Sequence, residues 1–185
     1  MSIRVIAGEF KRRVLSTPPG QLTRPTSARV REALFSILGD VSGLRVLDLY
    51  AGSGALGIEA LSRGAEHAVF VERGRAALAC IRKNLETLKA SERATLLAVA
   101  VERLASSTLE SQGPFQLVLC DPPWADIESA AEAVSQLLPK LGRAVQLVFE
   151  HPAGCSPDVF GATKTDERTW GDTGMSLWTT VGADS

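Results

Sequence analysis

The feature that most constrains this chain is a glycine-rich turn that follows a short apolar segment. Residues 46–50 read Val-Leu-Asp-Leu-Tyr, and after them Gly52, Gly54 and Gly57 have the spacing G-x-G-x-x-G. Glycine adopts positive φ without strain and lets a ligand approach the backbone, while the start of a following helix offers unpaired N–H groups. The pattern predicts a strand, a turn and a helix that hold a ligand, with purely structural glycines as the alternative.

Strand-like and helix-like segments alternate along the chain after Gly43. The expected strands lie at residues 44–50, 67–72, 95–99, 115–120 and 144–149. The expected helices between them lie at 56–63, 76–88, 101–109 and 129–138. This alternation is typical of a doubly wound, mostly parallel α/β sheet. Two further strands, at 159–165 and 176–181 and joined through 167–172, would add a C-terminal antiparallel hairpin and bring the sheet to seven strands.

The beginning of the chain is strongly basic. Residues 3–7 and 13–16 flank 8–12 and predict a small β-hairpin with a basic tip, and Thr26 or Ser27 is a good N-cap for the helix that follows. We expect residues 1–25 to form a basic extension and residues 26–185 the main domain, in one compact unit. A basic end favours an anionic partner, with a solvated face as the alternative. The basic side chains are Arg4, Lys11, Arg12, Arg13, Arg24, Arg29 and Arg31.

Several classes of protein are disfavoured by composition. The three cysteines, Cys80, Cys120 and Cys155, are far apart and form no Cys-x-x-Cys pair, so buried reduced thiols are expected and a metal site is not. No apolar run approaches the roughly 20 residues that span a bilayer, and the N-terminus lacks the apolar segment of a signal peptide. We expect a soluble, cytoplasmic protein.

Two carboxylates near the turn narrow the choice of ligand. Glu72 ends the second expected strand twenty residues after Gly52, where a carboxylate can bind both hydroxyls of a ribose. Asp48 would repel the pyrophosphate of a dinucleotide but attract a sulfonium and an ammonium group. The pattern G-x-x-x-x-G-K-[ST] of triphosphate sites is absent from the sequence. S-adenosylmethionine therefore fits better than a dinucleotide or a nucleoside triphosphate.

A second motif, Asp121-Pro122-Pro123-Trp124, follows the fourth expected strand. Two prolines remove two N–H donors, and the residue before a proline is held extended, so that Asp121 is aimed out of the strand end. A carboxylate beside a free carbonyl can accept both hydrogens of an exocyclic amine, and Trp124 offers a face for stacking a base. The alternative without a functional role is a proline loop with a surface tryptophan.

Together these motifs resemble the class I S-adenosylmethionine-dependent methyltransferases that act on amino groups. More closely, the chain resembles the bacterial 16S rRNA guanine-N2 methyltransferase family, the RsmD-like group. The resemblance covers nearly the whole chain. It rests on Arg4–Gly8, Thr23–Phe35, Leu47–Gly54, Asp121–Trp124 and Trp170–Thr173.

The resemblance implies a Rossmann-like methyltransferase that transfers a methyl group to N2 of one guanine of 16S rRNA, in the small subunit or an assembly intermediate. Asp121, Pro122, Pro123 and Trp124 would form the catalytic clamp around the guanine. The basic residues named above would contact RNA. The cofactor would be bound by Asp48, Tyr50, Ala51, Gly52, Ser53, Gly54 and Glu72, with the backbone of Ala100 and Val101 next to the adenine because no Asp or Asn is available there.

Other acceptors and a non-enzymatic role are alternatives. Adenine N6 in DNA or RNA and a protein glutamine amide each present a planar NH2 group, so the Asp-Pro-Pro motif fits them as well. An RNA-binding assembly factor with an inert methyltransferase fold would be expected to carry a damaged turn or a damaged Asp-Pro-Pro motif. Both motifs are intact in this sequence. A dehydrogenase is the alternative from another reaction class.

Overall fold

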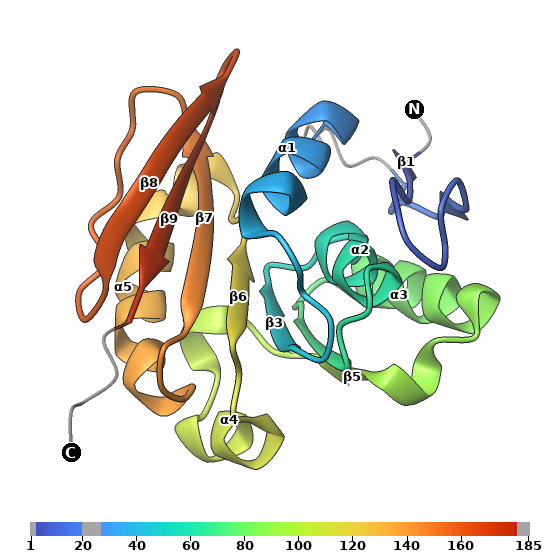
Figure 1. Ribbon diagram of the computed structural model, residues 1–185. Helices are drawn as coiled ribbons and strands as arrows, with labels where there is room; N and C mark the ends of the chain where they lie inside the picture. Colours follow the sequence, from blue (N-terminus) through green and yellow to red (C-terminus); the bar gives the residue numbers. More distant parts are fainter. Residues whose placement is uncertain (1–2, 20–26, 181–185) are drawn as a thin grey trace.

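The computed structural model describes residues 3–19 and 27–180, which contain a seven-stranded sheet (Figure 1). The strand order is β5-β4-β3-β6-β7-β9-β8; the first five strands are parallel, and β9 pairs antiparallel with both β7 and β8. The predicted doubly wound sheet with a C-terminal antiparallel hairpin is thereby confirmed. The strands are β3 (Arg45–Leu49), β4 (His67–Val71), β5 (Ala94–Leu97), β6 (Leu117–Cys120), β7 (Gln146–Pro152), β8 (Thr163–Trp170) and β9 (Thr173–Thr179).

Helices cover both faces of the sheet because the central strands are apolar on both sides. Along β3, Val46 packs into one core cluster and Leu47 into the other, as the alternation of side chains in a strand requires. Helices α1, α2 and α3 contribute to the first cluster, and α4 and α5 to the second. Their bounds are α1 (Ala28–Leu38), α2 (Ala55–Ser62), α3 (Arg75–Leu88), α4 (Ser106–Gln112) and α5 (Ile127–Leu137).

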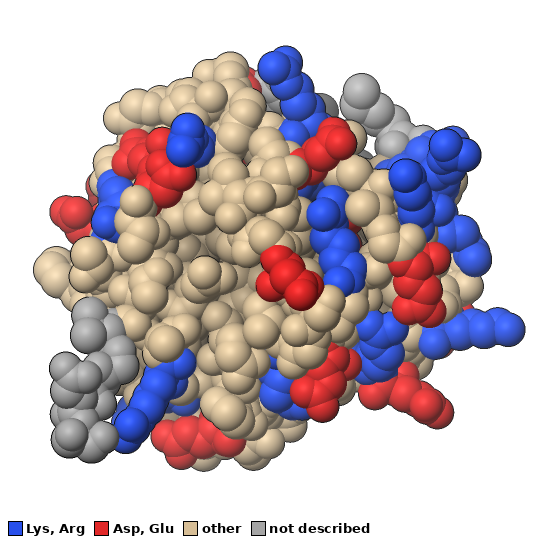
Figure 2. Space-filling view, in the orientation of Figure 1, with Lys and Arg blue, Asp and Glu red and all other residues tan. Residues whose placement is uncertain are grey.

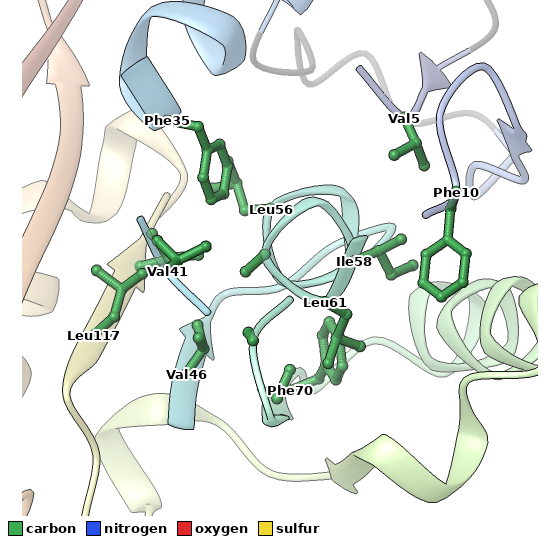
Figure 3. Close-up of a cluster of buried hydrophobic side chains, with 14 of the residues drawn as sticks. Val5, Phe10, Phe35, Val41, Val46, Leu56, Ile58, Leu61, Phe70 and Leu117 are labelled. Carbon is green, nitrogen blue, oxygen red and sulfur yellow. The ribbon is translucent and has the colours of Figure 1, made fainter. Parts of the chain in front are cut away.

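The N-terminal segment, residues 3–19, forms an arm that packs on the outside of α2 and α3 (Figure 1). The predicted hairpin is present as β1 (Ile3–Arg4) paired with β2 (Val14–Leu15). Val5 and Phe10 are 3% and 5% exposed and belong to the same core cluster as Ile58 of α2 (Figure 3). The arm is therefore part of the first hydrophobic core rather than a loose appendage.

Polar contacts attach the arm to α2 as well. The buried carboxylate of Glu59 accepts hydrogen bonds from the backbone amides of Ile6, at 2.8 Å, and Ala7, at 3.1 Å. Arg63 Nε donates to the same carboxylate at 2.8 Å. At the end of α2, Ser62 Oγ accepts from the Phe10 amide at 2.9 Å and donates to the Ala7 carbonyl.

Three local predictions need correction or refinement. The segment expected as one helix at 101–109 is a 3-10 turn (Val101–Arg103) followed by α4. The C-terminal hairpin turns at Gly171, whose φ is +64°, and not over residues 167–172, because β8 continues through Trp170. The three cysteines are free, but only Cys120 is fully buried.

No helix among the described residues is long and apolar enough to cross a membrane.

Replacing Glu59 by Ala tests how firmly the arm is held. The change leaves the amides of Ile6 and Ala7 without their acceptor, and we expect the free energy of unfolding to fall by about 2 to 4 kcal/mol. Urea unfolding measures this change, with Glu86→Ala on the exposed side of α3 as the control. Equal midpoints for the two variants would contradict the assigned anchoring role of Glu59.

Candidate functional site

The glycine turn, residues 51–54, joins the carboxyl end of β3 to α2, and its conformation needs glycine. Gly52 and Gly54 have φ of +55° and +78°, and Gly54 is the N-cap residue of α2. The Gly54 amide donates to the Ala51 carbonyl at 2.7 Å, and the Gly52 amide donates to Glu72 Oε2 at 2.9 Å. Two peptide groups of the turn are thus fixed from within the chain.

A third constraint on the turn comes from Asn84 of α3, which the sequence analysis missed. Its Nδ2 donates to the Ser53 carbonyl at 3.1 Å and to the Ser16 carbonyl at 3.0 Å, and its Oδ1 accepts from the Ser16 amide at 2.7 Å. The sequence carries no local signal for this residue, because its partners are 31 and 68 positions away.

Asp48 is buried, contrary to the expectation that its carboxylate faces the ligand. It is 1% exposed, and its Oδ2 accepts from the Gly57 amide at 2.9 Å beneath α2. A Cβ on Gly57 would lie 2.4 Å from the Phe70 ring and 2.9 Å from this oxygen, so the third glycine is needed for close packing of helix on strand.

Burial raises the pKa of Asp48 well above its usual range, and the Gly57 amide opposes this only in part. The negative charges of Asp121 and Glu72 raise the pKa further. Asp121 and Glu72, which follow the adjacent strands β6 and β4, therefore lie close enough to Asp48 of β3 to disfavour its ionised form. This end of the sheet favours a ligand with positive charge.

Glu72 follows β4 and connects two loops. Its Oε1 accepts from the Gly74 amide at 2.6 Å, and its Oε2 accepts from the Gly52 amide. A carboxylate has about four lone-pair positions, so each oxygen can accept one more hydrogen bond. Glu72 can hold the turn and two ligand hydroxyls together.

The segment after β5 reaches the turn through Tyr50. Tyr50 has φ of +58°, and its hydroxyl donates to Glu102 Oε1 at 2.7 Å, a partner that the sequence analysis did not identify. Burial and the hydrogen bond to Glu102 raise the pKa of Tyr50 above its usual value. The bond ties the 3-10 turn Val101–Arg103, whose N-cap residue is Ala100, to Tyr50, the residue just before the glycine turn.

The Asp-Pro-Pro-Trp motif begins where β6 ends, next to the glycine turn. Cys120 pairs with Leu49 of β3, so Asp121 and Tyr50 follow two adjacent strands at one edge of the site. The Pro123 carbonyl accepts from the Asp126 amide at 2.8 Å. Within residues 3–19 and 27–180, no hydrogen bond to the Pro122 carbonyl is formed. Trp124 is 44% exposed. The motif thus presents a carboxylate, a carbonyl and an aromatic ring.

The predicted RNA-binding residues fall into three groups. Arg31 is 2% exposed, and its Nη2 donates to the Arg4 carbonyl at 2.8 Å. Its assignment to an RNA-facing surface is therefore wrong, because burial between α1 and the arm removes it from solvent. Arg24 lies outside the described residues. The exposed members are Arg4, Lys11, Arg12, Arg13 and Arg29.

No group of three or more His, Cys, Asp or Glu side chains that could hold a metal ion occurs in the parts of the chain given by the structure.

Comparison with known proteins identifies close relatives. Residues 3–179 match the family model described as "Conserved hypothetical protein 95". "Putative rRNA methyltransferase YlbH" of Bacillus subtilis is 35% identical over 182 residues, which is 95% of this chain and 98% of that protein. "Ribosomal RNA small subunit methyltransferase D" of Escherichia coli is 44% identical over 124 residues, which is 66% of this chain and 60% of that protein. The solved structure of "Putative methyltransferase yhhF" from Escherichia coli superimposes with a TM-score of 0.81 at 33% identity. The superposition covers 98% of this chain and 99% of that one.

Replacing Asp48 by Asn tests the buried carboxylate. A raised pKa means that the folded chain holds the proton more tightly than the unfolded chain, so this group's contribution to stability decreases as pH rises above the unfolded value of about 3.9. Asn keeps an acceptor for the Gly57 amide and carries no charge. We expect the melting temperature of the variant, minus that of the unaltered protein, to grow from pH 4 to pH 7.

Thermal melting at several pH values in this range gives the difference, in which the other titrating groups cancel. A difference that stays constant with pH would contradict a raised pKa for Asp48.

Proposed function

The chain belongs to the family described as "Conserved hypothetical protein 95", and from this premise we propose that it transfers a methyl group from S-adenosylmethionine to the exocyclic N2 amine of a guanine in 16S rRNA. The observation that carries the proposal is the juxtaposition of two motifs. The glycine turn and Asp121–Trp124 follow the paired strands β3 and β6 at the same end of the sheet.

The donor site fits S-adenosylmethionine, which has a ribose, a sulfonium and an ammonium but no phosphate. Glu72 would accept hydrogen bonds from the ribose hydroxyls, and the backbone of the glycine turn would contact the methionine part. The buried Asp48 would act through the position of the turn, because its carboxylate holds the Gly57 amide of α2. Ala100 and Val101 would contact the adenine through their backbone. When bound, this cofactor supplies a methyl group on a positively charged sulfur.

The acceptor site fits a flat amine. Asp121 would accept one hydrogen of the guanine amine, and the Pro122 carbonyl the other, while Trp124 stacks on the base. Bent hydrogen bonds of this kind draw the nitrogen lone pair out of conjugation with the ring and aim it at the methyl donor. Catalysis would rest on this near-attack placement and on stabilisation by Asp121 of the positive charge that develops on nitrogen. The proton can leave after transfer, so no base is needed before attack.

The arm fits an RNA substrate. Lys and Arg side chains gather on the side of the molecule where the arm and α3 lie (Figures 1 and 2). Positive side chains would pair with phosphates, with binding that weakens as salt rises. We propose that residues 1–25 contact RNA and residues 26–185 hold both reactants. The names of the curated relatives point to rRNA, and to the small subunit in the case of the Escherichia coli protein. A cytoplasmic location follows from such a substrate.

The proposal is tested by methylating small subunits from a strain that lacks this gene and mapping the labelled nucleotide. We expect one N2-methylguanosine in 16S rRNA. Label on adenine N6 would move the acceptor to another base, and label on protein would reject RNA as the substrate. The absence of transfer to any acceptor would favour a non-catalytic assembly factor.

Replacing Asp121 by Ala tests the acceptor clamp. Loss of the carboxylate removes the stabilisation of charge on the amine nitrogen, and we expect kcat to fall by about 100- to 1,000-fold. The dissociation constant of S-adenosylhomocysteine, measured by calorimetry, should change little. Asp158→Ala, at an exposed aspartate outside the site, is the control for kcat. Collapse of cofactor affinity with residual turnover would show that Asp121 has been misassigned.

A double variant, Lys11→Gln with Arg12→Gln, tests the arm. Two fewer phosphate contacts should lower the slope of log affinity against log salt by about 1.4 to 1.8, depending on whether the RNA is single-stranded or duplex. Filter binding across a salt series measures the slope. Lys140→Gln with Arg143→Gln removes two exposed charges after α5 and serves as the matched control. An equal effect in both pairs would contradict a specific role for the arm.

A further inference from the structure

Asn84 joins the arm to the glycine turn through a single side chain. It is 3% exposed, and its amide lies between Ser16 of the arm and Ser53 of the turn. Its Oδ1 accepts from the Ser16 amide, and both hydrogens on Nδ2 are donated, one to the Ser16 carbonyl and one to the Ser53 carbonyl.

The contacts explain why this position carries asparagine. The backbone N–H and C=O of Ser16 are both paired with one side-chain amide, which requires an acceptor and a donor side by side. The bond to the Ser53 carbonyl requires a second donor. Aspartate has the same shape but no donor, and alanine has neither group.

The bond to Ser53 fixes a peptide plane of the turn. The Ser53 carbonyl and the Gly54 amide belong to the same planar peptide group. The carbonyl is bonded to Asn84 and the amide to the Ala51 carbonyl. Both ends of the plane are therefore held, although Gly54 on its own could adopt many conformations.

We propose that Asn84 is a positioning residue that sets the cofactor turn and couples it to the RNA-facing arm. The inference rests on the proposed function, which assigns the cofactor to this turn. Asn84 stabilises the binding conformation of the turn only while Ser16 holds its side chain in place. Because coupling is reciprocal, cofactor bound at the turn also strengthens the attachment of the arm at Ser16. The arm is therefore held more firmly in its RNA-facing position when the methyl donor is bound.

The first test compares two ways of loosening the arm. Asn84→Ala removes the bonds to both Ser16 and Ser53, whereas Ser62→Ala removes bonds to Phe10 and Ala7 and leaves the turn untouched. We expect Asn84→Ala to raise the dissociation constant of S-adenosylhomocysteine by about three- to ten-fold, as loss of one preorganising hydrogen bond implies. Ser62→Ala should lower the melting temperature without changing this dissociation constant.

The outcomes separate the inference from the proposed function. Unchanged affinity in Asn84→Ala, or an equal loss in Ser62→Ala, would overturn the positioning role and leave the proposed function standing. Failure of the unaltered protein to bind S-adenosylhomocysteine would reject the proposed function and the inference with it. If Asn84→Ala does not fold, Asn84→Asp, which keeps the shape and loses both donors, replaces it.

The second test needs no variant. Hydrogen exchange of the Ser16 amide is followed in the unaltered protein with and without S-adenosylhomocysteine. Reciprocal coupling predicts that saturating ligand slows exchange at Ser16 several-fold, although Ser16 is not a ligand contact in the proposed site. The Phe10 amide, which is held by Ser62, is the internal reference and should change less. Equal slowing at both amides, or no change at Ser16 while ligand binds, would overturn the coupling.

Discussion

The interaction on which the site depends is the fixing of the glycine turn by groups outside it. Glycines make the turn possible, but their freedom would also let it adopt other conformations. Glu72 holds the Gly52 amide, Asn84 holds the Ser53 carbonyl, and Asp48 holds the Gly57 amide one turn of helix later. These partners come from three different parts of the fold: the loop after β4, helix α3 and strand β3. The turn is therefore preorganised by the fold as a whole, and the free energy of ligand binding is not reduced by the cost of ordering the turn.

The carboxylates near the turn determine which charge a bound ligand can carry. The buried Asp48 is kept near Asp121 and Glu72, although each negative charge raises the pKa of Asp48 and disfavours its ionised form. An arrangement of this kind lowers stability unless a positive ligand is present, which is a common property of binding sites. A cationic nucleoside without phosphates relieves the repulsion, whereas a pyrophosphate would increase it. The same charges lie beside the clamp, where methylation makes the acceptor nitrogen positive.

The sequence predicted the sheet, the hairpins, both motifs and the family because these depend on local patterns. Strand and helix periodicity, the glycine spacing and the Asp-Pro-Pro-Trp motif are each contained in a few consecutive residues. Other features depend on contacts that no local pattern records. The sequence predicts that Asp48 binds the cofactor, because strand alternation alone does not reveal that its face is covered by α2. Arg31 was expected to be exposed, but the arm packs over it, and Asn84 joins segments far apart in the chain.

The central claim is that the turn binds a cationic nucleoside cofactor without phosphates. Thermal melting of the unaltered protein with S-adenosylhomocysteine, NAD or no ligand tests it most directly, because a ligand that binds only the folded chain raises the melting temperature by mass action. We expect saturating S-adenosylhomocysteine to raise the melting temperature and NAD at the same concentration to leave it unchanged. Stabilisation by NAD, with no effect of S-adenosylhomocysteine, would contradict the claim.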